Sequence, residues 1–397
     1  YDLDFCRNHY DVFDDDNITV KTLAWYARKD NPLQYHNWHD NWCLPKLSKC
    51  YREQDDIIVA EAFYRVFWLD YLFYNKFWYK FDKSRLKKFK DEVYLRCDIT
   101  EKFIPKFISL RSQICEEQIN VKAHAGRSTR LEKESKDLEA HLSAITKLIK
   151  KLSSDRSRNI LVKCARDLFH IEDLHTILNI NPNLMGVKNG VIELTEEKAV
   201  FRPGKPEDYI TKKAGVSYRS EYNYGHPDIK KILLYFRQVF PNDQVNHHMK
   251  KDVAAMLYGG NPEKLFRMWI GDTNGSKSIF QSILNHMFGE YFCDLPAEFF
   301  SAGQKNSSGP NPELAQLKGA RIAFSAEPDD DADFKGARIK KMTGNDGFFA
   351  RGCGEDGGSV KATFKSFMAL NGVPNISGMD YATIKRLSMI LFEGEWL

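Results

Sequence analysis

The most constraining feature of the sequence is an apolar run that leads into a glycine-rich loop and then into a helix-like segment. Residues 265–270 read LFRMWI, which is typical of a buried strand, and the loop GDTNGSKS follows at residues 271–278. Apolar residues then recur at helical spacing over residues 279–287. This order predicts a phosphate-binding loop, because the backbone N–H groups and the helix N-terminus would face phosphate oxygens. A glycine-rich turn before an ordinary helix is the alternative.

The loop supplies candidate ligands for nucleotide phosphates and for a metal ion. They are Gly271, Asp272, Thr273, Asn274, Gly275, Ser276, Lys277 and Ser278. We expect Lys277 to neutralise phosphate charge and the Ser278 hydroxyl to bind Mg²⁺, so ATP and Mg²⁺ are the predicted cofactors. Ser276 stands where the usual pattern has glycine. A serine fits this position if its φ angle stays negative, and the departure weakens the pattern.

Polar residues that suit nucleotide hydrolysis follow the loop along the chain. A second apolar run, residues 321–327, ends in Glu327, whose carboxylate can polarise an attacking water and help to hold the metal. A third run, residues 367–370, leads to Asn371, which can orient that water or sense the γ-phosphate. Arg386 precedes another strand-like run, where a cation can reach the γ-phosphate of a neighbouring subunit. Each residue has a plain alternative, since strand-end glutamates, turn-forming asparagines and surface arginines are common.

Taken in order, these motifs resemble those of the superfamily 3 helicases. More narrowly, they resemble those of the poxvirus-type primase-helicases of nucleocytoplasmic large DNA viruses and related phages. The resemblance includes KKMTGND at residues 340–346, AR at residues 350–351 and LNGVP at residues 370–374. It covers most of the chain and is strongest over residues 180–392.

The resemblance implies three parts. Residues 226–397 would form an α/β motor domain of the P-loop, AAA+-like type, and residues 56–225 a mainly helical domain with a small β part. Residues 1–55 would be a connector that resembles the C-terminal module of the associated primase. Because the chain opens at Tyr1 without a methionine, we expect a fragment of a longer polypeptide whose upstream part holds the primase core. Such a fragment would unwind DNA or translocate on it without priming.

The resemblance also implies an activity, that of an ATP-dependent DNA helicase or translocase of viral DNA replication in the host-cell cytoplasm. Its partner would be single-stranded or forked DNA. The catalytic residues would be Lys277, Glu327, Asn371 and Arg386, with Ser278 and Glu327 at the metal. Arg386 would act in trans, as a finger that completes the site of the next subunit in a homo-hexameric ring. The alternatives are a nucleotide-gated scaffold ATPase that separates no strands, and a small-molecule P-loop kinase.

The segment 340–351 and the hairpin after it would line the channel of such a ring. The expected DNA contacts are Lys340, Lys341, Arg351, Lys361 and Lys365. Two features depart from the family pattern. Ala326 occupies a position where many relatives have a second carboxylate, and the hairpin at residues 352–358 carries Glu355 and Asp356 where a basic group would suit phosphate.

Charge and composition limit the other function classes. The 58 Lys and Arg residues against 54 Asp and Glu leave a net charge of +4, which excludes a polycationic nucleic-acid coat, so a DNA-binding surface must be local. The 8 cysteines are spread over the chain, which fits a reducing compartment. No apolar run approaches the roughly 20 residues that span a bilayer, and no signal-peptide core is seen, so we expect no membrane partner.

The N-terminal half contains several weaker patterns. The aromatic segment 57–81 favours a helical core with a flanking hairpin over a base-stacking platform. The heptad-like segment 126–153 predicts a long helix that packs inside a bundle or across a subunit boundary. Asn189-Gly190 indicates a hairpin turn.

Two sets of residues raise the question of a further metal. His36, His39, Cys43 and Cys50 offer four possible zinc ligands, but their spacing matches no common zinc site, and packing is the favoured interpretation. The run Asp329-Asp330-Asp331 is interpreted as a solvated loop rather than a metal site.

Overall fold

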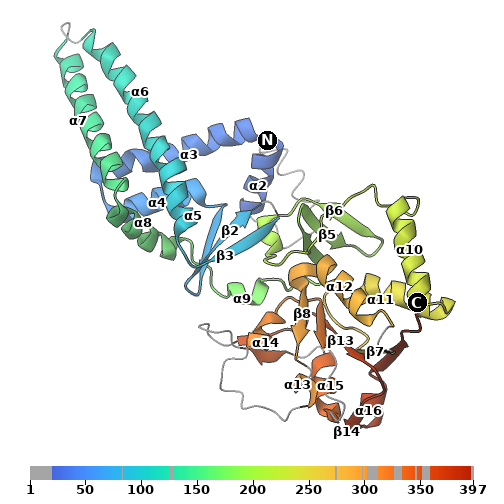
Figure 1. Cartoon of the computed structure of the whole chain (residues 1–397). Helices are drawn as coiled ribbons and strands as arrows, with labels where there is room; N and C mark the ends of the chain where they lie inside the picture. Colours follow the sequence, from blue (N-terminus) through green and yellow to red (C-terminus); the bar gives the residue numbers. More distant parts are fainter. Residues whose placement is uncertain are drawn as a thin grey trace. The chain divides into compact units, whose positions relative to one another are not determined.

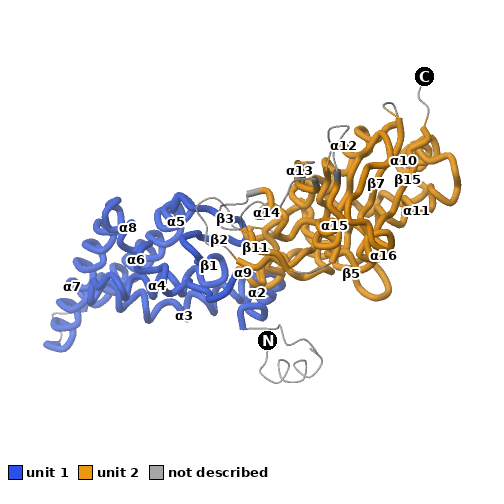
Figure 2. Tube along the Cα trace, turned by 90° about the horizontal axis from the view of Figure 1, so that it is seen from below, with its two compact units in different colours: residues 1–81, 87–174 blue, residues 82–86, 175–397 orange. Residues whose placement is uncertain are grey.

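The structure, a computed structural model, divides into two compact units (Figure 2). Unit 1 comprises residues 1–81 and 87–174, and unit 2 comprises residues 82–86 and 175–397. The residues that the structure describes are 20–82, 84–124, 128–272, 275–296, 298–301, 312–325, 333–344, 347–350 and 358–394. This division differs from the three-part expectation, because residues 20–55 pack with the helices after them and residues 175–225 belong to unit 2. Among the described helices, none has the length and apolar character needed to span a bilayer.

Unit 1 is mainly helical. Its helices are α2 (Val20–Asp30), α3 (Pro32–Glu53), α4 (Asp56–Phe67), α5 (Val93–Asp98), the π-helical turn η1 (Ile99–Phe103), α6 (Ile104–Lys122), α7 (Thr129–Leu152) and α8 (Asp155–Leu168). A small sheet of order β1-β2-β3 is formed by β1 (Tyr71–Tyr74), β2 (Phe77–Asp82) and β3 (Arg85–Phe89). The antiparallel pair α6 and α7 forms a long helical hairpin (Figure 1).

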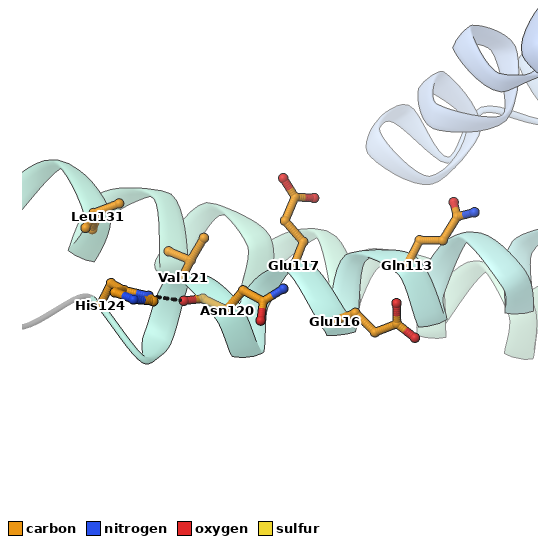
Figure 3. A pocket seen from close by; sticks show the side chains of 7 residues that line it. All are labelled: Gln113, Glu116, Glu117, Asn120, Val121, His124 and Leu131. Carbon is orange, nitrogen blue, oxygen red and sulfur yellow. Dashed lines mark hydrogen bonds between the residues drawn. The ribbon is translucent and has the colours of Figure 1, made fainter.

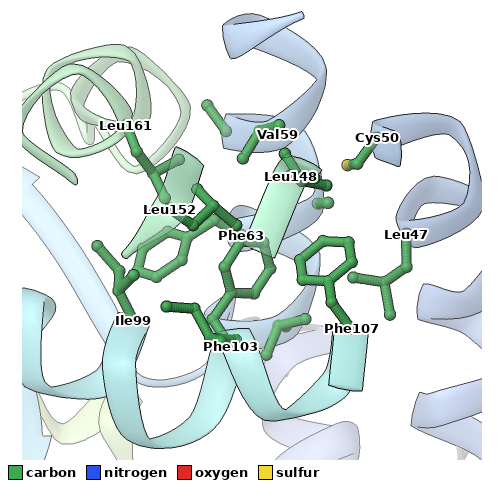
Figure 4. Close-up of a cluster of buried hydrophobic side chains, with 14 of the residues drawn as sticks. Leu47, Cys50, Val59, Phe63, Ile99, Phe103, Phe107, Leu148, Leu152 and Leu161 are labelled. Atoms are coloured by element: carbon green, nitrogen blue, oxygen red, sulfur yellow. The ribbon is translucent and has the colours of Figure 1, made fainter. Parts of the chain in front are cut away.

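The core of unit 1 gathers aromatic and aliphatic side chains from α3, α4, α6, α7 and α8 (Figure 4). Phe63 of α4 is fully buried, and Phe103 and Phe107 pack into the same cluster. The buried apolar residues of the segment 129–152 belong to this cluster too, so the heptad-like helix packs inside a bundle. The aromatic segment 57–81 is likewise core, as a helix followed by the β1–β2 hairpin, and that prediction is confirmed.

Unit 2 begins with a short helix and a small antiparallel sheet. The helix α9 (Leu174–Ile177) leads to β4 (Leu184–Val187), β5 (Gly190–Leu194) and β6 (Ala199–Arg202), in the order β4-β5-β6. Val187 pairs with Gly190, so the predicted hairpin is confirmed, but its two turn residues are Lys188 and Asn189 and Gly190 begins β5. The 3-10 turn η3 (Pro206–Asp208) and the helices α10 (Pro227–Val239) and α11 (Asp243–Ala255) follow.

The rest of unit 2 is built on a five-stranded parallel sheet of order β15-β7-β13-β9-β8. Its strands are β7 (Phe266–Ile270), β8 (Phe292–Leu295), β9 (Ile322–Ser325), β13 (Lys365–Leu370) and β15 (Leu387–Leu391). The helices between them are α12 (Lys277–Phe288), the turn η4 (Gly289–Tyr291), α13 (Glu298–Ser301), α14 (Pro312–Gln316), α15 (Gly336–Thr343) and α16 (Tyr381–Ile384). Two short pairs complete the unit, β10 (Asp333–Lys335) with β14 (Asn375–Ser377), and β11 (Phe348–Ala350) with β12 (Gly358–Val360).

Both faces of the parallel sheet are covered, which explains why β7 is apolar except for Arg267, whose buried guanidinium forms an ion pair with Asp252. Phe266, Met268 and Ile270 belong to one buried cluster, whereas Trp269 belongs to another that includes Phe280 of α12. This alternation follows from the two-residue period of a strand. The chain is therefore a mixed α/β protein with a parallel sheet and a helical N-terminal part, as the sequence predicted.

The strand order positions a candidate site. From β7 the chain passes to β8 at the far edge of the sheet, and from β13 it passes to β15 on the other side of β7. The connections from the adjacent strands β7 and β13 therefore leave in opposite directions. In open parallel sheets, ligands bind at the carboxyl ends of the strands where the direction switches in this way.

Candidate functional site

The structure brings together Lys277 and Asn371 at this switch point. Lys277 begins α12 after the loop that follows β7, and Asn371 follows β13 directly. The ammonium of Lys277, which is 9% exposed, donates to Oδ1 of Asn371 at 3.1 Å. It also donates to the carbonyl of Asp272 at 3.0 Å and to the carbonyl of Gly271. One buried cation thus joins the ends of two adjacent strands.

The loop before α12 lies close to the backbone that follows β15. A Cβ at Gly271 would lie 2.6 Å from the carbonyl oxygen of Phe392, and one at Gly275 would lie 3.1 Å from it. These distances leave no room for a side chain at Gly271 and little at Gly275. Glycine at both positions therefore lets the loop approach the backbone closely.

Ser276 corrects one expectation. Its φ angle is +66°, in the left-handed region, whereas the sequence argument required a negative φ for a serine here. Its hydroxyl is buried and has no hydrogen-bond partner among the described residues. The backbone therefore has the conformation that suits glycine, which is sterically strained for serine because serine has a Cβ atom. Ser278 lies in the first turn of α12 and is exposed.

Several predicted residues lie outside the described residues. They are Thr273, Asn274, Ala326, Glu327, Arg351, Glu355 and Asp356, together with the run Asp329–Asp331. The strand before Glu327 is described. It ends at Ser325, which pairs with Met368 of β13.

Arg386 lies at the amino ends of the parallel strands, whereas Lys277 lies at their carboxyl ends. It precedes β15, whose first residue, Leu387, pairs with Phe266 at the start of β7. Because β7 has 5 residues and a strand rises about 3.3 Å per residue, about 16 Å separates the amino end of the strand from its carboxyl end. The guanidinium of Arg386 donates to the carbonyl of Lys340 and to the hydroxyl of Thr343, both at 2.9 Å. Arg386 and Lys277 therefore do not meet within one chain.

The predicted DNA contacts are found in three different settings. Lys340 and Lys341 lie in the last turn of α15, where Lys341 is exposed and Lys340 forms an ion pair with Asp380 at 2.7 Å. Lys361 is exposed, directly after β12. Asp380, which sequence reasoning did not single out, also caps α16. The only signal for it in the nearby sequence is that aspartate is a common helix N-cap, and Asp380 accepts from the N–H of Thr383 three positions later.

Lys365 does not fit its predicted role. It begins β13 with 1% exposure, and its ammonium donates to the carbonyls of Tyr258 at 3.1 Å and Gly260 at 2.7 Å. Burial, and then the nearby charge of Arg267, lower the pKa of Lys365 to about 8. A side chain enclosed in this way cannot contact DNA, so that prediction is wrong. Residue type alone had suggested a surface lysine, because the burial depends on the strand's place in the sheet.

The candidate zinc ligands form no metal site. His36, His39, Cys43 and Cys50 all lie on the single helix α3. His39 Nε2 lies 2.9 Å from the carbonyl of Arg65, and Cys50 donates to the carbonyl of Ile58 at 3.4 Å. Burial raises the pKa of the Cys43 thiol to about 11. Among the described residues, no group of three or more His, Cys, Asp or Glu side chains could hold a metal ion.

A hollow of about 680 Å³ lies between α6 and α7 in unit 1 (Figure 3). It is lined by Gln113, Glu116, Glu117, Asn120, Val121, His124 and Leu131. Its carboxylates do not suit a phosphate group, since like charges repel. The hollow is therefore no candidate for the nucleotide.

Comparison with known proteins gives a consistent set of relatives. A family model described as D5 N terminal like matches residues 60–288. A protein named "Putative helicase" from Invertebrate iridescent virus 6 is 25% identical over 94% of this chain and 42% of its own length. Another of that name from Frog virus 3 is 23% identical, over 96% of this chain and 48% of its own length. A "Putative primase" of African swine fever virus is 22% identical over 62% of this chain and 26% of its own length.

The chain spans less than half of the length of these relatives. Among solved structures, the apo form of the NrS-1 C-terminal region is similar with a TM-score of 0.34 and 16% identity. That similarity covers 43% of this chain and 40% of the other.

Proposed function

Because the chain belongs to the D5 N-terminal-like family, whose model matches more than half of it, we propose that it contains the ATP-driven motor of a viral replicative helicase. Its relatives in large DNA viruses are named as helicases and primases, which supports membership of a replication helicase-primase family. The proposed reaction is ATP hydrolysis coupled to movement along single-stranded or forked DNA.

The observation that carries the proposal is the contact between Lys277 and Asn371 at the switch point of the parallel sheet. The first N–H groups of α12 and the Lys277 ammonium would bind the phosphates, in exchange for the carbonyls of Gly271 and Asp272. Asn371 would orient the attacking water from the next strand. The amide oxygen and the ammonium are already held within hydrogen-bond distance, so little reorganisation is needed.

The residues present fit a hard divalent cation such as Mg²⁺. The exposed hydroxyl of Ser278 follows Lys277, and oxygen ligands are those that Mg²⁺ prefers. We propose Ser278 and Glu327 as the residues that hold the ion. When bound, it would neutralise charge on the phosphate oxygens.

Arg386 is proposed to act on the site of a neighbouring copy. The length of the strands supports this, because Arg386 at their amino ends cannot reach the phosphate site at Lys277 of its own chain. A closed ring places each finger at the next site, and we propose a homo-hexamer. The exposed Lys341 and Lys361 and the half-exposed Lys340 are proposed DNA contacts, which concentrates positive charge locally in a chain of net charge +4.

Mixing two inactive variants tests the shared site. Lys277→Ala and Arg386→Ala should each lack DNA-stimulated ATPase activity. Mixed one to one, about a quarter of the interfaces would pair an intact loop with an intact finger, so activity should return to about a quarter of the wild-type value. Arg237→Ala, which removes an exposed arginine from α10, is the control and should keep full activity.

No recovery at any mixing ratio would contradict the action in trans. Strand displacement from a forked duplex then separates the motor from its alternative. ATPase activity without displacement on any fork would favour a nucleotide-gated scaffold ATPase.

A further inference from the structure

We propose that Asp380 is a positioning residue that couples the DNA-contacting helix α15 to Arg386. This inference rests on the proposed function. It assigns a regulatory role to a side chain that belongs to neither the phosphate-binding loop nor the proposed DNA contacts.

A closed circuit of contacts carries the inference. Oδ2 of Asp380 accepts from the Lys340 ammonium at 2.7 Å. Oδ1 accepts from the backbone N–H of Thr383 at 2.8 Å and from its hydroxyl at 2.7 Å, which caps α16. Arg386 follows α16 and returns to α15 through the carbonyl of Lys340 and the hydroxyl of Thr343. One carboxylate thus connects the side chain of Lys340 to the helix that holds Arg386.

The two ends of the circuit differ in exposure. Thr343 is fully buried, whereas the side chains of Lys340 and Asp380 are 34% and 52% exposed. The hydrogen bond from Lys340, followed by those from Thr383, holds the pKa of Asp380 well below its usual range, so its carboxylate stays charged near neutral pH. An exposed ion pair of this kind is weak and open to competition from another anion.

A DNA phosphate is such an anion. When it contacts Lys340, it competes with Asp380 for the same ammonium, and the circuit loses one connection. Arg386 can then leave α15 more readily and reach the phosphate of the neighbouring site. By linkage, Arg386 bound to that phosphate favours the DNA-bound state of Lys340. DNA-stimulated hydrolysis follows from this exchange of partners.

The variant Asp380→Asn tests the coupling. Asparagine is a good helix cap and can still accept from Thr383, but it removes the charge that holds Lys340. We expect ATPase activity without DNA to rise toward the DNA-stimulated level of wild type, because the connection from Asp380 to Lys340 is already lost. The melting temperature should stay within about 2 °C of wild type. Stimulation by single-stranded DNA should fall from its wild-type factor to about onefold. DNA should bind at least as tightly as to wild type, because a competing carboxylate is gone.

The control variant is Asp228→Asn, which neutralises an exposed carboxylate in the first turn of α10 that lies 3.6 Å from Lys231. It should keep wild-type stimulation. If DNA stimulates the wild type and Asp380→Asn equally, or if Asp380→Asn binds DNA more weakly, the inference alone is overturned. If DNA does not stimulate the wild type at all, the proposed function fails and the inference fails with it.

Discussion

Ser276 holds a backbone conformation that glycine adopts without steric cost. Its left-handed φ angle of +66° places Lys277 at the start of α12 with the ammonium directed to the ends of β7 and β13. For a residue with a Cβ atom this conformation costs about 1 kcal/mol. The position is therefore one where the local backbone serves the site at the expense of stability.

Replacing Ser276 by glycine should relieve this strain. We expect Ser276→Gly to raise the free energy of unfolding by about 1 kcal/mol, as measured by urea denaturation without nucleotide. Ser278→Gly is the matched control. It lies in α12 without a positive φ angle and should lower stability by up to about 1 kcal/mol, because glycine weakens helices. A destabilised Ser276→Gly protein would mean that the serine hydroxyl makes a stabilising contact.

For single residues, the position after a predicted strand was a better guide to the site than the type of side chain. Lys277 and Asn371 could be paired from sequence, because each follows an apolar strand and parallel strands align their carboxyl ends. Lys365 could not be assigned, because nothing near it in sequence shows that its ammonium meets the carbonyls of Tyr258 and Gly260. Those contacts depend on segments about a hundred positions away.

Helix α12 rests at its C-terminal end on the chain segment after the β4–β6 sheet. Gly215 donates its N–H to the carbonyl of Met287 at 3.0 Å. A Cβ at Gly215 would lie only 1.8 Å from the carbonyl oxygen of His286. The glycine thus lets two backbones touch, and this contact supports the helix that carries Lys277.

Gly215→Ala should therefore displace the end of α12. Because the obstacle is backbone, we expect a loss of about 3 kcal/mol or more in the free energy of unfolding, measured by urea denaturation. In Gly372→Ala the new Cβ would meet no atom within 4 Å, so this control should change stability by less than about 0.5 kcal/mol. If the two variants have the same free energy of unfolding, the close approach at Gly215 contributes little to stability.

Among the elements, the first hairpin was predicted beside a helix, but the residue at which the helix ends was not. Phe63, Phe67, Tyr71, Tyr74 and Trp78 repeat at helical spacing, yet α4 ends at Phe67 and the last three belong to β1 and β2. The turn between the strands has positive φ angles at Asn75 (46°) and Lys76 (67°). Glycine is the usual signal for such a turn, and Lys76 conceals it. At the second hairpin the pair Asn189-Gly190 indicated the hairpin correctly, although its turn is formed by Lys188 and Asn189, neither of which has a positive φ angle.

At the scale of the whole molecule, each unit has a hydrophobic core of its own. Phe63 lies in the core of unit 1, whereas Phe280 lies in a cluster confined to unit 2. The sequence predicted the helical and the α/β character of the two parts. It did not predict the boundary near residue 174, because the family resemblance assigned the small sheet β4-β5-β6 to the helical domain before it, whereas that sheet belongs to unit 2.

Damage to one core should therefore leave the other unit folded. Phe63→Ala removes a fully buried ring and should destabilise unit 1 by about 3–5 kcal/mol. Nucleotide binding by unit 2, measured with a fluorescent ATP analogue at 25 °C, should stay within about twofold of wild type. Ile57→Ala, on the same helix but 62% exposed, is the control for unit 1 stability. Loss of nucleotide binding in Phe63→Ala would show that the units unfold as one.

The position of β7 in the sheet also affects how the chain reaches its folded state during synthesis. β7 is made first among the five parallel strands, but both of its partners, β13 and β15, come about a hundred or more residues later. Until then its apolar residues and both of its hydrogen-bonding edges lack their final contacts. Pairings over such distances along the chain form slowly, and an unpaired apolar strand is prone to aggregate. The strand that leads into the phosphate-binding loop of the proposed motor is thus also the one that gains most from a chaperone.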